Sequence, residues 1–267
     1  MDCTVALRNG PIDRLNALRM KISIITATYN SAATIKDTLV SIQEQDHRDI
    51  EHIIIDGGSV DDTPAIVSGF PHVAKWVSEK DKGIYDAMNK GIRLATGDVI
   101  GILNSDDVYT GPSVLSAIAG AFADPAIMTA YADLQYVHPN DLDKVLRTWK
   151  TGNFRKENFY YGWMPPHPTF FVRKEVYEKA GLFNIDLRSA ADYEIMLRIL
   201  LRHGIPAHYI PGVIVKMRAG GMSNASLFNR IRANKEDRLA WKLNGLQPYF
   251  FTLYMKPLRK IPQFIIK

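Results

Sequence analysis

The first half of the chain alternates short apolar, β-branched runs with amphipathic stretches. Four runs have the composition of buried strands: residues 21–30, 51–56, 73–78 and 98–103. Between them lie three stretches with helical features: residues 31–45, a short helix starting at Asp61, Asp62 and Thr63, and residues 83–95. Because strands and helices alternate with short connections, we predict an α/β fold with a doubly wound, mainly parallel sheet flanked by helices.

The second half of the chain is less regular. Pro112 is expected to open a helix, and residues 126–131 to form a fifth strand. The elements expected next are a strand and a helix in 170–181, a helix in 191–204, short strands at 207–210 and 213–218, and one or two basic helices. The predicted divisions are a disordered extension (1–19), one domain (20–225, with a donor half at about 20–110 and an acceptor half at about 111–225) and basic amphipathic C-terminal helices (226–267).

Cysteine content and hydropathy narrow the class of protein. The chain has 267 residues and one cysteine, Cys3, so no internal disulfide forms, which fits a reducing compartment. Because there is no Cys/His cluster, a metal site would need oxygen ligands. No apolar run reaches the roughly 18 residues of a membrane span, and the N-terminal stretch does not have the pattern of a secretory signal. A cytoplasmic protein is therefore expected.

Positive charge is concentrated at the C-terminal end. The formal net charge is +5, and residues 226–267 contain nine Lys or Arg but two Asp or Glu. The remaining chain is net negative, which argues against a nucleic-acid binder. Basic residues of this tail are mixed with Phe250, Phe251, Tyr254 and Phe264, which suits an anionic membrane surface on the inner face of the cytoplasmic membrane. The alternative is a solvated helix packed back onto the domain.

Polar loops follow the predicted strands. In open α/β sheets, ligands bind beyond the carboxyl ends of the strands, and the four loops there read TATYN, DGGSVDDT, SEKDKG and NSDD. In NSDD, Asp106 and Asp107 repel each other unless a cation lies near them, and a hard divalent ion with phosphate partners suits this pair. An isolated NSDD segment is also compatible with a turn or a helix cap.

The loop after the second strand has more polar groups than a helix cap needs. Asp56 is placed to accept a hydrogen bond from a nucleobase or a ribose hydroxyl, and Gly57 and Gly58 allow close approach of a ligand to the backbone. Two other nucleotide-binding classes are disfavoured. A dinucleotide-binding dehydrogenase would carry GxGxxG after the first strand, where this chain has TATYNS, and there is no GxxxxGK[ST] motif.

The segments TATYN, DGGSVDDT, EKDKGIYDAMNKGI and LNSDD together resemble the family 2 inverting glycosyltransferases of the GT-A fold, of the bacterial surface-polysaccharide type. The order and spacing match over about residues 20–110, and a looser match continues to about 225. The resemblance implies a GT-A-type fold and transfer of a sugar from a nucleotide-diphospho-sugar, often a UDP-sugar, to a glycan or lipid-linked acceptor. It also implies Mn²⁺ or Mg²⁺ as cofactor.

The resemblance assigns roles to individual residues. It places these residues at the donor nucleotide: Thr26, Thr28, Asn30, Asp56, Asp81, Gly83, Asn89, Lys90, Asn104, Ser105 and Asp106. Asp106 and Asp107 are the candidate metal ligands. Asn104 stands where the family's common DADD pattern has its first acid, which leaves open which of the two aspartates binds the metal directly.

An inverting transfer needs a general base that takes the proton of the attacking acceptor hydroxyl. The resemblance places this role on Asp192, in the segment RSAADYEIMLRI, although the Glu that usually precedes this Asp is Ala191 here. The alternative for Asp192 is a carboxylate favoured by the helix dipole. Glu194 is the fallback base and a candidate acceptor contact.

Three further residues receive roles from the resemblance. His167, in PPHPTFFVR, lies in the acceptor-side loop, and Trp163, in FYYGW, is placed to stack on a sugar face. Arg218, in KMRAGGMSN, is placed to pair with the diphosphate. Each has a plainer alternative: a structural histidine, aromatic packing in the core, and a surface charge.

Two other functions remain as alternatives. A sugar nucleotidyltransferase has a related core and metal site, but it would carry a glycine-rich, basic loop after the first strand, which TATYNS is not. A non-catalytic module that binds nucleotide-sugars would have no need to keep Asp106, Asp107 and Asp192 together.

Overall fold

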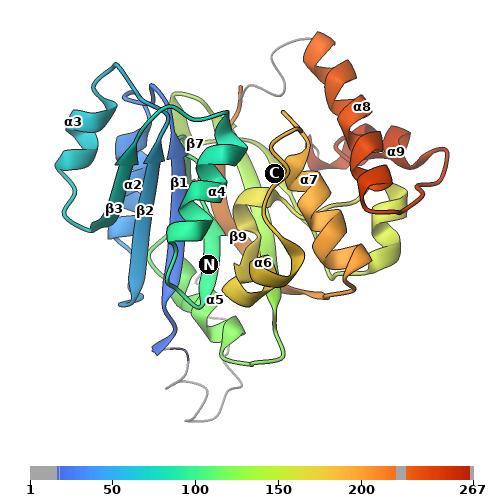
Figure 1. Cartoon of the computed structure of the whole chain (residues 1–267), viewed down its shortest axis with the longest axis horizontal. Helices are drawn as coiled ribbons and strands as arrows, with labels where there is room; N and C mark the ends of the chain where they lie inside the picture. The colour runs from blue at the N-terminus through green and yellow to red at the C-terminus, as the bar shows by residue number, and fades with distance from the viewer. Residues whose placement is uncertain (1–16, 18, 221–226, 265–267) are drawn as a thin grey trace.

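The computed structural model describes residue 17, residues 19–220 and residues 227–264. Within them, nine strands form one sheet with helices on both faces (Figure 1). The α/β fold expected from the sequence is therefore confirmed. The disordered extension predicted for residues 1–19 falls almost wholly outside the described residues.

The first four strands make the parallel part of the sheet, in the order β3-β2-β1-β4. Their bounds are β1 Ile22–Thr28, β2 Ile50–Asp56, β3 Val73–Ser78 and β4 Val99–Ile102. In the register of this sheet, Thr28 lies opposite Asp56, and Asp56 lies opposite Ser78. The carboxyl ends of these three strands are therefore level, and the loops that follow them meet at one edge.

The rest of the sheet is mixed rather than parallel. It contains β5 Asp107–Tyr109, β6 Thr129–His138, β7 Asp141–Trp149, β8 Phe171–Arg173 and β9 Ala207–Arg218. β8 runs antiparallel to β4 and to β6, whereas β6 and β9 are parallel. The two short strands predicted at 207–210 and 213–218 are in fact the single strand β9. The pairing of β9 with β6 shifts register between the two predicted strands, next to Gly212. The φ angle of Gly212 is 119°, a value that favours glycine.

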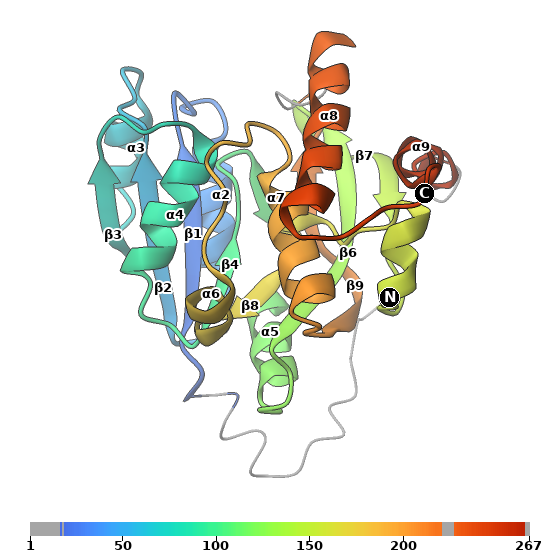
Figure 2. The same cartoon turned by 45° about the vertical axis from the view of Figure 1, so that its right-hand side comes forward.

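Helices cover the two faces of the sheet separately (Figures 1 and 2). On one face lie α2 (Ile35–Gln43), α3 (Thr63–Ser68) and α5 (Val114–Phe122), and on the other lie α4 (Ile84–Leu94), α6 (Lys174–Ala180) and α7 (Ala191–Met196). The alternation of strand side chains explains both cores, since Ile53 and Ile55 pack with the α4 side and Ile54 packs with α2 and α3.

The C-terminal segment forms helices that pack against the α7 side. A π-helix over Leu197–Arg202 continues α7, and α8 (Leu227–Leu243) and α9 (Thr252–Leu258) follow β9. Trp241 of α8 is fully buried, and its indole Nε1 donates a hydrogen bond to the Tyr193 hydroxyl at 3.0 Å. Short 3-10 turns cover Lys156–Tyr161 (η1), His167–Thr169 (η2) and Pro262–Phe264 (η5). None of the described helices is long and apolar enough to cross a membrane.

Candidate active site

The loops that follow β1, β2 and β4 are tied to one another by hydrogen bonds. The hydroxyls of Ser31 and Ser105 lie 2.9 Å apart, and the Ser31 amide donates to Thr63 Oγ1 at 2.8 Å. Asn30, whose φ is 48°, accepts a hydrogen bond from the Val60 amide on its Oδ1 at 3.0 Å. Asn30 and Ser105, both predicted at the donor, thus hold three separate loops at one edge of the sheet.

Asp56 is fully buried at the end of β2. Its carboxylate accepts hydrogen bonds from the Ser59 amide at 3.0 Å, the Ser59 hydroxyl at 2.5 Å and the Ser78 hydroxyl at 2.6 Å. These bonds join the β2 and β3 ends. Asp56 was predicted to bind the nucleotide directly, and its observed partners show that it shapes the loop around Gly57 and Gly58.

Gly57 lies close to the side chains of Asp81 and Tyr29. A Cβ atom there would lie 2.8 Å from Asp81 Oδ2 and 3.4 Å from Tyr29 Cδ2, so glycine is needed for these side chains to approach. Asp81 also accepts a hydrogen bond from the Gly83 amide at 2.8 Å, which fixes the loop before α4. Tyr29 is 62% exposed. An exposed aromatic ring beside a carboxylate and a bare backbone can hold a planar base.

The two threonines of β1 have different surroundings. Thr26 lies inside the strand and not in the loop, contrary to the prediction, and its hydroxyl lies 3.0 Å from His52 Nε2 within the buried sheet. Thr28 ends the strand, and within the described part of the chain its buried Oγ1 has no hydrogen-bond partner. The Thr28 hydroxyl can therefore still form a hydrogen bond, whereas the Thr26 hydroxyl already has a partner.

The two adjacent aspartates differ in burial. Asp107 begins β5, pairs with Met217 of β9 and is fully buried, while Asp106 is partly exposed. Burial, followed by the neighbouring charge of Asp106, raises the pKa of Asp107 well above its usual value, and burial also raises the pKa of Asp106. Asn104 Nδ2 donates to Asp107 Oδ2 at 3.1 Å.

The oxygens of this segment fit a hard divalent cation. Among the described residues, Asp107 Oδ1 and Asn104 Oδ1 are buried without a hydrogen-bond partner, and burying such oxygens is costly unless a ligand compensates. No group of three His, Cys, Asp or Glu side chains in the described ranges forms a complete metal site. A pair of carboxylates is what Mg²⁺ or Mn²⁺ needs when phosphate oxygens and water supply the remaining ligands.

Asp192 faces the same edge of the sheet from the first turn of α7. Tyr85 of α4 donates its hydroxyl to Asp192 Oδ1 at 3.2 Å, and His167 Nδ1 lies 3.5 Å from Asp192 Oδ2. Burial, together with the charge of Asp192, raises the pKa of Tyr85, so its phenol keeps the proton that it donates. The carboxylate is thus held on both oxygens and remains partly exposed.

His167 connects Asp192 to the aspartate pair. Its Nε2 lies 3.3 Å from Asn104 Nδ2, while its Nδ1 faces Asp192. Because the Asn104 amide nitrogen also donates to Asp107, Nε2 of His167 is the acceptor and its proton resides on Nδ1, directed at Asp192. Burial lowers the pKa of His167, opposed by the charges of Asp192 and Asp106. An aspartate at position 104 would lack the N–H that sets this tautomer.

Several residues with predicted binding roles are instead occupied by protein contacts. Trp163 is 5% exposed, donates its Nε1 to Thr151 O at 3.0 Å and packs edge-on to Phe159 at 5.3 Å between centroids. It therefore belongs to the core. Lys90 forms an ion pair with Glu79 at 2.8 Å beside the loop before α4.

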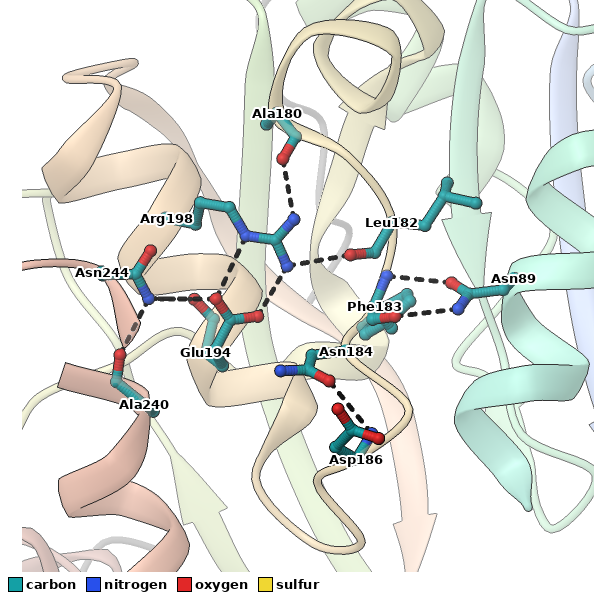
Figure 3. Close-up of polar contacts among 10 residues, drawn as sticks. All are labelled: Asn89, Ala180, Leu182, Phe183, Asn184, Asp186, Glu194, Arg198, Ala240 and Asn244. Carbon is teal, nitrogen blue, oxygen red and sulfur yellow. Dashed lines mark hydrogen bonds and ion pairs between the residues drawn. The ribbon is translucent and has the colours of Figure 1, made fainter. Parts of the chain in front are cut away.

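Glu194 and Asn89 are also structural (Figure 3). Glu194 is 4% exposed and pairs with Arg198 at 2.6 Å, and Asn244 of the segment after α8 donates to it at 3.1 Å. Asn89 exchanges two hydrogen bonds of 2.9 Å with the backbone of Phe183, which fixes the chain that leads to α7. Glu194 is thereby occupied by protein contacts, and of the two predicted bases only Asp192 is partly exposed.

Arg218 closes the site from the end of β9. It is 7% exposed and donates to the carbonyl oxygens of Asp106 at 2.7 Å and Pro139 at 3.0 Å, and it pairs with Asp37 at 2.5 Å. All three guanidinium nitrogens have protein partners, so Arg218 positions the aspartate segment and is not a free cation for a diphosphate. A lone arginine before a Gly-Gly pair gives no sequence signal of this role.

Sequence reasoning missed Tyr29 and Tyr85. Both lie inside segments that the motifs covered, TATYN and EKDKGIYDAMNKGI, but motif positions do not reveal which side chain is exposed or bonded. Tyr85 sits in the first turn of α4, one residue after Ile84, and it reaches Asp192 only because α4 and α7 share one face of the sheet.

An open α/β sheet with a carboxylate pair and a separate carboxylate at its carboxyl edge has the features of an enzyme whose ligand binds beyond the strand ends. Residues 23–181 match the sequence model of Glycosyl transferase family 2, so the chain belongs to this family and is a glycosyltransferase. A Mycobacterium tuberculosis protein described as an uncharacterized glycosyltransferase is 36% identical over 183 residues, covering 67% of this chain and 69% of that protein.

Other relatives agree with this assignment. A PGL/p-HBAD biosynthesis glycosyltransferase of Mycobacterium bovis is 29% identical over 76% of this chain and 78% of its own length. Among solved structures, S. aureus TarS 1–349 has a TM-score of 0.66 at 19% identity, covering 91% of this chain and 72% of its own. The mannosyltransferase PcManGT from Pyrobaculum calidifontis, in complex with GDP-Man and Mn²⁺, has a TM-score of 0.63 at 23% identity, covering 89% and 69%. These structures confirm the GT-A fold.

Proposed function

We propose that the protein transfers a sugar from a nucleotide-diphospho-sugar to a hydroxyl of a glycan or lipid-linked acceptor, with inversion at the anomeric carbon. The observation that carries the proposal is the placement of Asp192 at the same edge as Asp106 and Asp107, with His167 and Asn104 between them. A base on one side of a reacting centre and a diphosphate site on the other is the arrangement that a direct displacement needs.

In the proposed reaction the acceptor hydroxyl oxygen attacks the anomeric carbon of the donor sugar. The bond from that carbon to the diphosphate oxygen breaks, and the nucleoside diphosphate leaves with the electron pair. The hydroxyl proton passes to the Asp192 carboxylate. Tyr85 donates a hydrogen bond to this carboxylate, and the His167 imidazole directs Nδ1 at its other oxygen, while the carboxylate remains partly exposed.

Asp106 and Asp107 would hold the Mn²⁺ or Mg²⁺ ion. When bound, the cation supplies positive charge to the diphosphate as it departs. Arg218 contributes indirectly, since its hydrogen bond to the Asp106 carbonyl and its ion pair with Asp37 fix the segment that carries the aspartates.

For the nucleotide we propose a site beside Gly57, where Tyr29 and Asp81 lie close to the backbone. Tyr29 supplies an exposed ring for the base, and Asp81 and the unpaired hydroxyl of Thr28 supply polar contacts. A UDP-sugar is the proposed donor. TarS has been solved with UDP and with UDP-GlcNAc, and PcManGT with GDP-Man, so related folds take both nucleotides. The cytoplasmic location expected from the sequence stays a prediction.

Nucleotide titration tests this function. We expect UDP to bind more tightly in the presence of Mn²⁺ than in the presence of a chelator, because the cation links the diphosphate to the aspartate pair. Because a UDP-sugar is the proposed donor, UDP should also bind more tightly than GDP or dTDP. Isothermal titration calorimetry with each nucleotide measures this. Equal binding with and without Mn²⁺ for all three nucleotides would contradict the proposed donor site.

Two substitutions of His167 test its role as a positioning residue for Asp192. An asparagine amide replaces Nδ1 in space and a glutamine amide replaces Nε2, so His167→Asn should keep the contact to Asp192 and His167→Gln the contact to Asn104. We expect kcat to fall by about tenfold more in the glutamine variant, because one lost hydrogen bond to a charged group is worth about 1.5 kcal/mol.

The measurement is steady-state kcat and KM for both substrates. We expect the donor KM to stay unchanged in both variants, since the proposed nucleotide site at Gly57, Tyr29 and Asp81 is formed by other residues. If both variants lose kcat equally, or if the main change is in acceptor KM, His167 contacts the acceptor as the sequence suggested and does not position the base.

A further inference from the structure

Exposed apolar side chains form a stripe along the last helical segment. Phe250 is 87% exposed, and Tyr254, Leu258, Ile261 and Phe264 are each more than half exposed. Their spacing of three to four residues places them on one side of α9 and of the turns that continue its helical path. We call these five residues the apolar stripe. A row of large apolar groups at this spacing indicates a surface that another partner covers.

The opposite side of α9 is fixed against the domain, so the stripe cannot turn inward. Thr252 is fully buried and donates its hydroxyl to Tyr160 O at 2.6 Å, and Leu253 is buried beside it. At Gly162, whose φ is 76°, an added Cβ would lie 2.5 Å from Lys256 N, which shows how closely η1 and α9 approach.

Exposed cations lie next to the stripe. Lys235, Arg238 and Lys242 of α8 are exposed, as is Arg259 at the end of α9. The guanidinium carbon of Arg238 lies 6.0 Å from the centroid of the Tyr254 ring, so the cations of α8 border the stripe directly. Both helices lie at the end of the molecule away from β3 (Figures 1 and 2).

The two carboxylates of this segment bind groups other than Lys235, Arg238, Lys242 and Arg259. Residues 226–267 contain two acids, Glu236 and Asp237. Glu236 accepts hydrogen bonds from the Ser189 amide and hydroxyl at 2.7 and 2.9 Å, and Asp237 is 8% exposed and bound by Lys256 at 2.7 Å. A second copy of the chain on this face would set cation against cation, whereas an anionic surface neutralises them.

We infer that the apolar stripe and the cations of α8 and α9 dock the enzyme on an anionic lipid bilayer. The aromatic and aliphatic side chains enter the headgroup region, and the Lys and Arg side chains meet lipid phosphates. This inference deepens the proposed function, on which it rests for a membrane-borne acceptor. The stripe and the cations lie on α8, α9 and the turns that follow, whereas Asp192 lies on α7, so docking and catalysis can be tested by separate substitutions.

Vesicle co-sedimentation of the full chain tests the inference. We compare vesicles of pure phosphatidylcholine with vesicles in which about a third of the lipid is phosphatidylglycerol. Wild type should bind the anionic vesicles, and binding should weaken as salt screens the charges. Arg238→Gln with Arg259→Gln should weaken binding by roughly fivefold for each cation removed. Phe250→Ser with Leu258→Ser should weaken it by on the order of tenfold for each side chain.

A matched control is Arg93→Gln with Leu94→Ser, which removes one exposed cation and one exposed apolar group at the end of α4. It should bind vesicles as wild type does. Equal binding of wild type to both kinds of vesicle, or unchanged binding by the stripe variants, overturns the inference. So does a wild-type dimer in sedimentation velocity that Phe250→Ser abolishes. Metal-dependent UDP binding by the same samples shows whether such a failure is confined to this surface or extends to the proposed function.

Discussion

Replacing Asp192 by asparagine is expected to lower kcat for sugar transfer by about 10³-fold, within the range contributed by general bases. The carboxamide keeps the shape of the side chain and can still accept the hydrogen bond of the Tyr85 hydroxyl. It cannot take the proton of the acceptor hydroxyl. Because Asp106, Asp107 and the proposed nucleotide site at Gly57 are untouched, the affinity for the nucleotide should stay near that of wild type.

The measurement is the initial rate of transfer together with calorimetric titration of UDP in Mn²⁺. Asp186→Asn is a matched control, because Asp186 is an exposed carboxylate in the loop before α7, shown in Figure 3, and its loss removes the same charge. It should leave both readouts unchanged. If Asp192→Asn loses nucleotide binding and keeps transfer, the base lies elsewhere and Asp192 belongs to the donor site.

The first half of the fold was predictable because local pattern and tertiary environment agree there. Every residue of β1 is buried, so a strand of the parallel type appears in the sequence as one apolar run. β7 was missed because it lies beside β6 alone, has few buried residues and carries charged residues, so its sequence, DLDKVLRTW, lacks a clear period of two. β5 is only three residues long and begins at the last residue of NSDD.

The site was predictable as a set of loops but not as a set of contacts. Asp106, Asp107 and Asp192 are brought to one edge as expected, because strand ends collect polar loops. Whether a polar side chain faces a ligand or another protein group depends on residues far away in sequence. Arg218 is bound to Asp37, and Glu194 to Arg198 and Asn244, and no local pattern reveals such partners. Asn104 is understood only once His167 is seen beside it.

Replacing Asp107 by asparagine is expected to have two opposite effects. Metal-dependent UDP binding should be lost, and kcat should fall by about 10²-fold or more, since charge on the leaving diphosphate is worth several kcal/mol. In the presence of a chelator, however, the variant should be more stable than wild type at neutral pH. Asp107 is fully buried, and its Oδ1 has no hydrogen-bond partner among the described residues, so its charge costs the folded state free energy.

The sign of the pH dependence follows from the raised pKa of Asp107. An acid with a raised pKa binds its proton more tightly in the folded state, so its contribution to stability is present below the unfolded pKa of about 3.9 and is lost as the pH rises through the folded pKa. Wild type in chelator should therefore lose stability across this range, by about 1.4 kcal/mol for each unit of the shift. The asparagine variant should lack this pH-dependent loss of stability, because it has no carboxyl group at position 107.

Urea unfolding in chelator at several pH values measures the effect, with Asp49→Asn as the control, because Asp49 is an exposed carboxylate. The control should follow wild type at every pH. Adding Mn²⁺ should stabilise wild type and leave Asp107→Asn unchanged, because a ligand stabilises only the folded state that binds it. If Asp107→Asn is still stabilised by Mn²⁺ and Asp106→Asn is not, Asp106 is the direct ligand and the buried Asp107 serves to support β5.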